Sequence, residues 1–420
     1  MTKKIFLISY WVNKEGNSPA IMADDKIESL LRLKYKVTVL SSYASQKIKK
    51  KNLDHYRIPS LSFNDFKFEF VDAFKNKDLL KIIFFLPFVL VFGIIFDLIQ
   101  FFFLKGIGGG KWYWSLTSIP LSIIIKIIFK PDILISTGGP ASAHFTGLVT
   151  SKLFRCKFLV YLQDPLVGSD IGRNSNSKNY LKIFEKLLVH ECDKLVFVTK
   201  AAALEAIKRY KKSENCKKIF AIYSGAVRQV KNFKFYLKKN KKNKKNKLFI
   251  HVGTLYNSRN LDNFIKTLNL LESKKEIDLK NIRVFNLGDI YGEIKKNYSK
   301  VPFFTSQAAI SRKKAIQKSL EADILLLVQH KDQRSKTTIP YKTYDYLNTK
   351  KLVFGLLNNN ELKKILLKRG HVCANVNDKK DIALKLNYLL KNFKNIQKKV
   401  SQTKLNFSHY EQTKKLLKGI

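Results

Sequence analysis

Cysteine is scarce in this chain of 420 residues, which contains only four. They lie far apart, and none of their spacings is that of a metal-binding pair. So few cysteines in a chain of this size are typical of a protein of the reducing cytoplasm. The seven histidines are scattered as well, so the sequence predicts no metal site. The cysteines are Cys156, Cys192, Cys216 and Cys373.

Acidic residues are also few, 32 against 79 lysines and arginines, which gives a formal net charge of +47. This excess predicts affinity for polyanions, such as nucleic acid, anionic lipid or phosphorylated substrates. Lys, Asn, Ile and Phe are abundant together, as in proteins translated from AT-rich genomes, and much of the Lys is scattered. Composition alone therefore accounts for about half of the excess charge.

A secretory signal is missing. The basic residues Lys3 and Lys4 precede an apolar run at 5–8, which is too short for the core of a signal peptide, and no small-residue cleavage site follows. We interpret this run as the first strand of a sheet and expect a cytoplasmic protein.

Strand-like apolar runs alternate with helical segments along the chain. With 45% hydrophobic residues, the chain is long enough for two folded domains, each with its own core. Runs that are apolar on both faces and separated by helices predict parallel sheets covered by helices. The runs are 5–9, 37–41, 132–136, 158–162, 195–199 and 219–223 in a first set, and 248–252, 284–287, 324–328 and 352–356 in a second.

A Lys/Asn tract at 238–247 separates the two sets and cannot form a core. We interpret it as part of a linker; a nucleic-acid-binding arm is the alternative, although no aromatic residue interleaves the lysines for base stacking. The predicted division is an N-terminal domain at 1–230, a basic linker at 231–247, a C-terminal domain at 248–395 and a segment at 396–420. The last helix of this segment opens at Asn406 and runs through Leu417.

The apolar stretch at 82–104 is long enough to span a bilayer. A span would place the strands at 5–9 and 132–136 on opposite sides of the membrane, whereas they should share one sheet. We therefore predict a monotopic element, broken near Pro87 and lying in the membrane interface, with a buried helical hairpin as the alternative. Flanking lysines and the aromatic residues Trp112, Tyr113 and Trp114 are its predicted interfacial anchors.

Two short stretches carry the clearest functional signal. In the first, an apolar run at 248–250 leads to Gly253, and Arg259 follows just before a helical pattern begins. A small residue at such a turn lets backbone N–H groups approach an anion, and an arginine can form a bidentate contact with phosphate. In the second, Pro340 suits the first turn of a helix that carries Lys342 and, one turn later, Asp345.

Phosphate-binding groups at two helix starts, with a carboxylate for a ribose hydroxyl, predict a nucleotide-sugar pocket. Each motif alone has a simpler alternative. The first could be an ordinary strand-to-helix turn with a surface arginine, and the acid of the second could be a solvated residue on a helix. Their order along the chain, each after a strand-like run, favours the pocket.

The two stretches together resemble the donor half of the retaining glycosyltransferases of family 4, which have the GT-B fold. That family has a Gly-x-Leu turn followed by a basic residue, then a Pro-x-Lys-x-x-Glu-Tyr-Leu helix. In this chain Asp345 replaces the Glu of that helix, and an earlier Glu of many members falls on Thr337. The resemblance implies two Rossmann-like domains with parallel sheets facing across a cleft. It also implies donor contacts, which fall on Gly16, Gly253, Thr254, Arg259, Lys342, Tyr344 and Asp345.

The acceptor side is indicated by two strand ends in the N-terminal domain. The run at 132–136 leads to Gly138 and Gly139, and the run at 158–162 is followed by Asp164. Clefts of open α/β sheets lie at such carboxyl ends. These ends resemble family 4 enzymes with lipid-linked acceptors, in which an acidic residue faces the cleft. Asp164 is the candidate catalytic carboxylate, and capping of the next loop is its alternative role.

The resemblance implies transfer of a sugar from a UDP- or GDP-linked donor, with retention and without an obligatory metal or other cofactor. The expected acceptor is a lipid-linked glycan, such as a bacterial surface-polysaccharide precursor, met at the anionic inner face of the cell membrane. The last helix of the family often crosses back to the N-terminal domain, and we expect the same here. The alternatives are a GT-B protein that binds a nucleotide sugar without transferring it and a basic nucleic-acid-binding protein.

Overall fold

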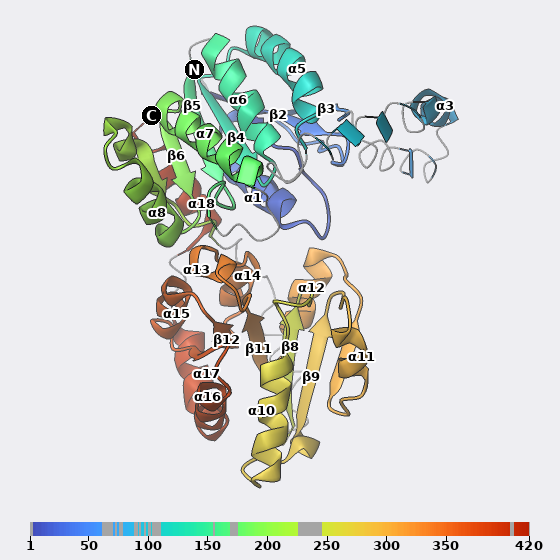
Figure 1. The fold of residues 1–420 in the computed structure, drawn as a ribbon, viewed down its shortest axis with the longest axis vertical. Helices are drawn as coiled ribbons and strands as arrows, with labels where there is room; N and C mark the ends of the chain where they lie inside the picture. The colour runs from blue at the N-terminus through green and yellow to red at the C-terminus, as the bar shows by residue number, and fades with distance from the viewer. Residues whose placement is uncertain are drawn as a thin grey trace. The chain divides into compact units, whose positions relative to one another are not determined.

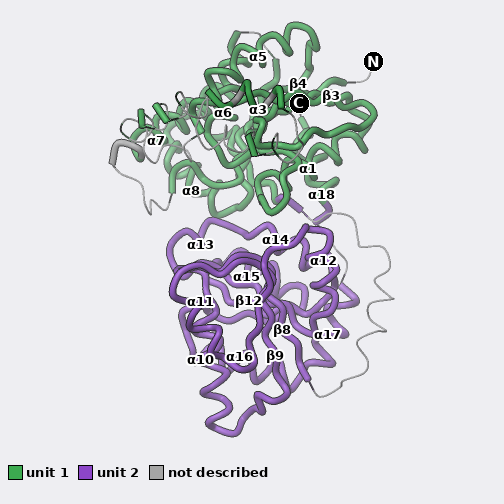
Figure 2. Tube along the Cα trace, turned by 90° about the vertical axis from the view of Figure 1, so that its right-hand side faces the viewer, with its two compact units in different colours: residues 1–223, 409–420 green, residues 224–408 purple. Residues whose placement is uncertain are grey.

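The computed structural model describes residues 3–60, 79–87, 111–153, 156–168, 175–225, 246–403 and 407–419, with a few residues between 70 and 102. The chain forms two compact units (Figure 2). Unit 1 comprises Met1–Tyr223 together with His409–Ile420, and unit 2 comprises Ser224–Ser408. Most of the Lys/Asn tract predicted as a linker lies outside the described residues.

The described part of unit 1 contains a seven-stranded parallel sheet in the order β3-β2-β1-β4-β5-β6-β7 (Figure 1). Every run of the first predicted set is a strand, and the sheet gains β3, which the sequence analysis missed. The strands are β1 (Lys4–Ile8), β2 (Lys36–Ser42), β3 (Leu53–Ile58), β4 (Ile133–Gly138), β5 (Lys157–Leu162), β6 (Lys194–Phe197) and β7 (Ile219–Ala221).

Helices cover both faces of this sheet because side chains alternate along each strand. Phe6 and Ile8 of β1 pack with α5, α6, α7 and α8 on one face, whereas Ile5 and Leu7 pack with α1 and α18 on the other. The helices are α1 (Ser18–Arg32), α3 (Leu79–Pro87), α5 (Trp114–Phe129), α6 (Ala141–Leu153), α7 (Ser175–Glu191), α8 (Lys200–Tyr210) and α18 (His409–Leu417).

The described part of unit 2 contains a six-stranded parallel sheet in the order β10-β9-β8-β11-β12-β13. The second predicted set is confirmed, and β10 and β13 are added at the two edges. The strands are β8 (Lys247–Val252), β9 (Ile282–Leu287), β10 (Phe304–Gln307), β11 (Ile324–Val328), β12 (Leu352–Leu357) and β13 (Val372–Asn375). The helical pattern predicted after Arg259 is α10 (Asp262–Ser273), whose Phe264 packs between Phe249 and Phe354.

The other helices of unit 2 fall into two groups. The short helices α13 (Arg334–Thr337) and α14 (Lys342–Asn348) follow β11 and therefore lie at the carboxyl end of the sheet (Figure 1). The rest are α11 (Ile294–Ser299), α12 (Arg312–Ser319), α15 (Asn360–Leu367), α16 (Lys379–Lys391) and α17 (Phe393–Gln402).

The C-terminal segment contains two helices where the sequence analysis expected one. Within 396–420, α17 ends at Gln402 and belongs to unit 2, whereas α18 begins at His409 and belongs to unit 1. The α18 helix packs against α1, and the His409 Nδ1 atom lies 2.9 Å from the Ser29 Oγ atom. Leu416 is fully buried in the unit 1 core. The chain therefore returns to its first unit to complete that core.

The predicted membrane element at 82–104 lies largely outside the described residues. Its start is part of α3, which ends at Pro87, where the sequence analysis expected a break. Among the described residues, no helix combines the length and the apolar character that crossing a membrane requires.

Two of the three predicted aromatic anchors of this element, Tyr113 and Trp114, are wrong. Trp114 is fully buried and Tyr113 is 7% exposed, both in unit 1. Trp112 packs edge-on against Phe145 and Phe184. Tyr113 and Trp114 therefore belong to the core of unit 1, and Trp112 is partly buried against it.

Candidate functional site

Each sheet has one point at which the strand order reverses. In unit 1 the chain runs outward from β1 to β3 and returns with β4 beside β1; in unit 2 it runs from β8 to β10 and returns with β11 beside β8. Ligand sites of open α/β sheets lie at the carboxyl ends of such neighbouring strands, because the loops diverge there. The residues following β8 and β11 and those following β1 and β4 are therefore the places to look.

The turn after β8 is built by close backbone packing. Gly253 has a φ of 123°, which favours glycine, and its N–H donates to the carbonyl oxygen of Leu287 at 2.7 Å. A Cβ atom placed on Gly288 would lie 2.5 Å from the backbone of Gly253, so only glycine fits at 288. A tight turn follows, in which Tyr256 and Arg259 exchange two backbone hydrogen bonds. The predicted Gly253 turn is therefore a rigid platform for the side chains after it.

Lys342 at the start of α14 reaches back to the end of β8. Its Nζ atom lies 2.6 Å from the Nε2 atom of His251 and 3.0 Å from the carbonyl oxygen of Val252. One turn later, the Tyr346 hydroxyl accepts a hydrogen bond from the Val252 N–H at 2.8 Å. The structure thus brings together the two stretches that the sequence analysis singled out.

Arg259 lies beside the same strand end. Its Nε atom donates to the carbonyl oxygen of Thr254 at 3.1 Å, and its guanidinium stacks over the Tyr256 ring at 4.7 Å. Thr254 therefore contributes a backbone contact that orients Arg259. The terminal N–H groups of this guanidinium have no acceptor among the described residues, which leaves them able to bind an anion.

A third cation, Arg334 of α13, was missed by the sequence analysis. Its guanidinium binds the Asp332 carboxylate at 2.7 Å and the Ser258 hydroxyl at 2.7 Å. His330 joins this group, since its Nδ1 atom lies 2.8 Å from Ser258 Oγ and its Nε2 atom 3.0 Å from the Tyr256 hydroxyl. Both residues follow β11 directly, so they stand beside the turn after β8.

The electrostatics of this group follow from mutual repulsion and burial. Burial and the Arg259 charge hold the pKa of Lys342 well below its usual range. Burial also lowers the pKa of Arg259, and the Arg334 charge adds to that effect. Burial and the neighbouring arginines lower the pKa of His330 to about 4, so this imidazole is neutral at physiological pH. Cations that disfavour one another in an empty site become stable when an anion binds between them.

Asp345 faces a partner within unit 2. Its carboxylate accepts from Arg312 of α12 in a bidentate ion pair, at 2.8 Å and 3.3 Å. Tyr344, another predicted donor contact, is 1% exposed, and its ring packs edge-on against Tyr341. Tyr344 therefore supports α14 from the inside, whereas Asp345 is held in a fixed orientation.

Some of the N–H groups at the predicted helix starts are engaged within the protein. At the start of α10, the N–H of Leu261 donates to the Tyr298 hydroxyl and that of Asp262 to Asn260. Those groups are already satisfied. The α14 helix has only seven residues and a correspondingly small dipole. The positive charge described at this site comes from side chains, and a phosphate contact by the other N–H groups of α10 and α14 stays a prediction.

The equivalent edge of unit 1 carries glycines and neutral polar side chains, beside two aromatic rings. Lys14 lies over the Trp11 ring at 5.8 Å and Lys111 over the Tyr10 ring at 5.6 Å. A Cβ atom on Gly138 would lie 3.5 Å from the Ser9 hydroxyl, and one on Gly139 would lie 3.6 Å from Pro19. The Gln163 amide, one residue after β5, donates to the Pro19 carbonyl oxygen at 3.1 Å. The predicted strand ends therefore meet at the start of α1.

Two sequence-predicted residues lie in the loops of that edge. Asp164, next to Gln163, is exposed. Gly16 is exposed as well and has a φ of 71° in the turn before α1. The predicted roles of these two residues rest on the resemblance.

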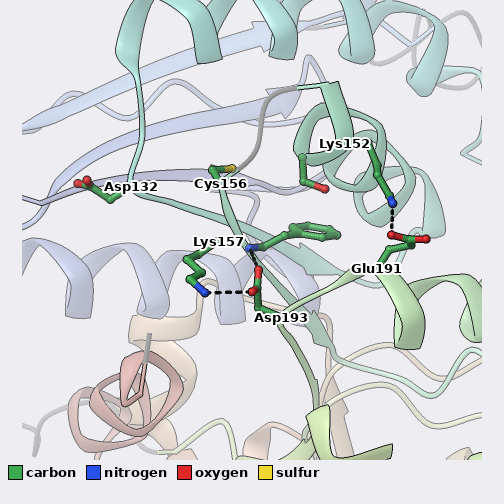
Figure 3. Close-up of a pocket in the computed structure, with 8 residues that line it drawn as sticks. Asp132, Lys152, Cys156, Lys157, Glu191 and Asp193 are labelled. Atoms are coloured by element: carbon green, nitrogen blue, oxygen red, sulfur yellow. Dashed lines mark hydrogen bonds and ion pairs between the residues drawn. The ribbon is translucent and has the colours of Figure 1, made fainter. Parts of the chain in front are cut away.

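A cavity of about 700 Å³ lies elsewhere in unit 1, at the amino ends of β4 and β5 (Figure 3). Its charged side chains are engaged with the protein: Lys152 pairs with Glu191, and Lys157 with Asp193. Because ligand sites of parallel sheets lie at the opposite strand ends, we do not assign the function to this cavity.

No protein-family model and no curated protein sequence matches this chain. Solved structures do match it over nearly its whole length. Anabaena HepE in complex with UDP and glucose aligns with a TM-score of 0.64 at 10% identity, covering 99% of this chain and 98% of that one. WaaG, a glycosyltransferase involved in lipopolysaccharide biosynthesis, aligns with a TM-score of 0.62 at 11% identity, covering 99% and 100%.

A glycosyltransferase from Rickettsia africae aligns with a TM-score of 0.60 at 14% identity, covering both chains fully. At these identities the likeness establishes the fold. The chain therefore has the GT-B fold, with the two Rossmann-like domains that the resemblance in its sequence predicted.

Proposed function

We propose that the protein is a glycosyltransferase that moves a sugar from a nucleotide diphosphate sugar to a lipid-linked glycan at the cytoplasmic membrane face. The observation that carries the proposal is the grouping of Arg259, Arg334 and Lys342 at the reversal point of the unit 2 sheet. A leaving nucleoside diphosphate carries its negative charge on adjacent phosphates. Arg259 and Lys342 around one strand end would neutralise that charge without a metal ion, and Arg334, paired with Asp332, would add N–H donors beside them.

Unit 2 would hold the donor. In this scheme Arg259 and Lys342 contact the diphosphate, and the Gly253 turn lets it approach the backbone closely. Asp345 accepts a hydrogen bond from the ribose, with Arg312 fixing its orientation. The GT-B neighbour HepE was crystallised with UDP and with UDP-glucose, which supports a UDP-linked donor here.

Unit 1 would hold the acceptor. Asp164 is the candidate carboxylate for activating the acceptor hydroxyl. Gly16 would approach the donor phosphates from its loop. Retention at the anomeric carbon is proposed from the family 4 resemblance of both strand-end motifs.

An exposed apolar face on α5 supports attachment to a membrane. Leu116, Ile124, Ile127 and Ile128 all point outward and are at least half exposed, and α5 has no acidic residue. Leu80, Ile83 and Phe84 of α3 are exposed as well. Apolar side chains inserted into the interface, together with the attraction of a strongly basic chain to anionic lipid, would give stable attachment. We place the attachment on α3 and α5, because these helices expose apolar side chains whereas the predicted anchors Tyr113 and Trp114 are buried.

A second candidate function is a GT-B protein that binds a nucleotide sugar without transferring it. The observation that favours it is Thr337, which stands where many family 4 enzymes have a glutamate. Turnover separates the two candidates, since a binder would release neither free sugar nor nucleoside diphosphate from UDP-glucose. A nucleic-acid-binding protein is disfavoured because the described site cations gather at a strand end, without a row of exposed aromatic rings.

Calorimetric titration with UDP, GDP and uridine tests the donor site. We expect Arg259→Ala to weaken UDP or GDP binding about 10- to 100-fold, because a charge-assisted hydrogen bond contributes roughly 1.5–3 kcal/mol. Uridine binding should be unchanged. Arg283→Ala, which removes an exposed arginine of β9, is the matched control and should bind like the wild-type protein.

Two results would contradict this assignment. If the wild-type protein binds neither nucleotide, the donor site is wrong. If Arg259→Ala weakens uridine and UDP binding equally, Arg259 maintains the fold and does not contact phosphate.

A further inference from the structure

Two fully buried polar residues, His251 of β8 and Asn286 of β9, lie behind Lys342 and have no role in the scheme above. The Nε2 atom of His251 lies 2.6 Å from the Lys342 Nζ atom, and its Nδ1 atom lies 2.6 Å from Asn286 Oδ1. The Asn286 Nδ2 atom lies 2.7 Å from the carbonyl oxygen of Gly288. The four residues form one chain of hydrogen bonds that ends on the backbone.

The direction of every bond in this chain is determined. A carbonyl oxygen only accepts, so the NH₂ group of Asn286 must face Gly288 and its oxygen must face His251. His251 must then carry its proton on Nδ1, which leaves Nε2 as an acceptor. The Lys342 ammonium donates to it. Burial and the Lys342 charge lower the pKa of His251 well below its usual range, so the ring stays neutral and able to accept.

This arrangement leaves one N–H of Lys342 for a ligand. An ammonium group has three donors, and the structure gives two acceptors, His251 Nε2 and the Val252 carbonyl oxygen. The other charged or titratable groups acting on Lys342 are Arg259 in the turn after β8 and His330 after β11. Arg259, and His330 if protonated, would oppose the positive charge of Lys342. Of the described side chains in contact with Lys342, the neutral His251 ring is therefore the one that favours its charged form. Asp345, on the same helix, is paired with Arg312.

We propose that His251 and Asn286 are positioning residues, which aim the ammonium group of Lys342 at the leaving diphosphate and keep it charged. The proposal rests on the donor site proposed above. Lys342 contacts the ligand, His251 acts through Lys342, and Asn286 acts through His251 by fixing its tautomer.

The test measures the affinity for UDP from about pH 5.5 to about pH 9.5 in the wild-type protein and in each variant. Every affinity is divided by that of Lys342→Met at the same pH, which cancels the effect of the ionisation of UDP itself. Wild-type affinity should fall as pH rises and Lys342 loses its proton. His251→Phe removes the acceptor of the charged ammonium, so the fall should move about one unit to lower pH. Asn286→Asp places a negative charge behind the ring, so the fall should move to higher pH.

The proposal is supported if the pH at which UDP affinity falls moves in opposite directions in His251→Phe and Asn286→Asp, while both variants retain their affinity for uridine. A purely structural role would weaken uridine and UDP binding together, without opposite shifts, and would overturn it. Unshifted profiles in variants that bind UDP overturn the positioning role while the donor site stands. Failure of the wild-type protein to bind UDP or GDP overturns both proposals. If one variant does not fold, the sign of the shift in the other still decides.

Discussion

The two units share one topology but carry opposite chemistry at the same place in it. In unit 2 the strand ends at the reversal point carry Arg259, Arg334 and Lys342. In unit 1 the corresponding edge carries Ser9, Gly138, Gly139 and Gln163, and the lysines beside it lie over the aromatic rings of Tyr10 and Trp11. A parallel sheet that reverses its strand order creates a place for a ligand, and the side chains in the loops decide which ligand it accepts.

Buried histidines give a second contrast between the units. Burial lowers the pKa of His144 in unit 1 to about 4 and that of His371 in unit 2 to about 3. Unit 2 also contains His251 and His330 with lowered pKa values, next to cations. In unit 1, burial and the charges of Lys47 and Arg57 also lower the pKa of His55 to about 4. Among the described residues, the pKa is therefore lowered at three histidines in unit 2 and at two in unit 1.

The largest expected effect follows from this contrast: acid should unfold unit 2 before unit 1. In the unfolded chain a histidine titrates near 6.5, above its folded pKa, so the unfolded state binds more protons as pH falls below about 6.5. The stability that is present above that pH is lost as the pH falls towards 4 and below. At each fully buried ring the loss is roughly 1.4 kcal/mol for each unit of difference between the folded and the unfolded pKa. Hydrogen exchange resolved by segment, measured from neutral pH down to about pH 4, checks the order.

His371→Gln should reduce the loss of stability of unit 2 at acid pH, and His144→Gln should reduce that of unit 1. Earlier opening of unit 1 in the wild-type protein would reverse the comparison.

The next largest effect concerns two buried lysines, Lys342 in unit 2 and Lys26 in unit 1. Lys26 is 2% exposed, lies 3.5 Å above the Tyr161 ring, and has a pKa lowered by burial to about 7. Lys342→Met should weaken UDP binding about 10- to 100-fold, from the roughly 1.5–3 kcal/mol of a charge-assisted bond. Lys26→Met should leave UDP binding unchanged, because its charge faces an aromatic ring in the other unit. Equal losses in the two variants would mean that buried charge matters only to folding; calorimetry decides.

The smallest expected effect concerns membrane binding by exposed apolar side chains of the two units. Ile128 of α5 is 77% exposed in unit 1, and Leu384 of α16 is 64% exposed in unit 2. If α5 inserts into a membrane, Ile128→Ser should reduce binding to anionic vesicles about five- to tenfold, since withdrawing one such side chain from lipid costs about 1–1.5 kcal/mol. Leu384→Ser, the matched control, should bind vesicles like the wild-type protein. Flotation at moderate salt measures both, and identical losses would exclude α5 as the attachment face.

The sequence predicted the interior of both sheets but missed three edge strands. Central strands are buried on both faces and appear as unbroken apolar runs. The edge strands β3, β10 and β13 do not: β3 alternates buried and exposed residues, β10 is mostly exposed, and β13 has four residues. Their pairing depends on a neighbour far along the chain, which a local pattern does not contain.

The site was predicted in part for a similar reason. Gly253, Arg259 and Lys342 stand in recognisable turns, and the fold brings them together as expected. Arg334 and His330 follow β11 without any periodicity, and their importance appears only when β11 is known to lie beside β8. Attention to polar residues directly after each predicted strand would have found both. The role of Trp114 could not be predicted, since a large aromatic ring suits a core and an interface equally.

The return of α18 to unit 1 has a consequence for synthesis on the ribosome. Unit 2 is continuous in sequence, so all of it has been made before α18, whereas unit 1 lacks Leu416 and the Ser29–His409 contact until α18 emerges. Domains generally fold as units in the order in which they are completed. The second unit of this chain can therefore finish folding before the first, and loss of α18 would damage unit 1, although all of unit 2 lies between α18 and the rest of unit 1 in the sequence.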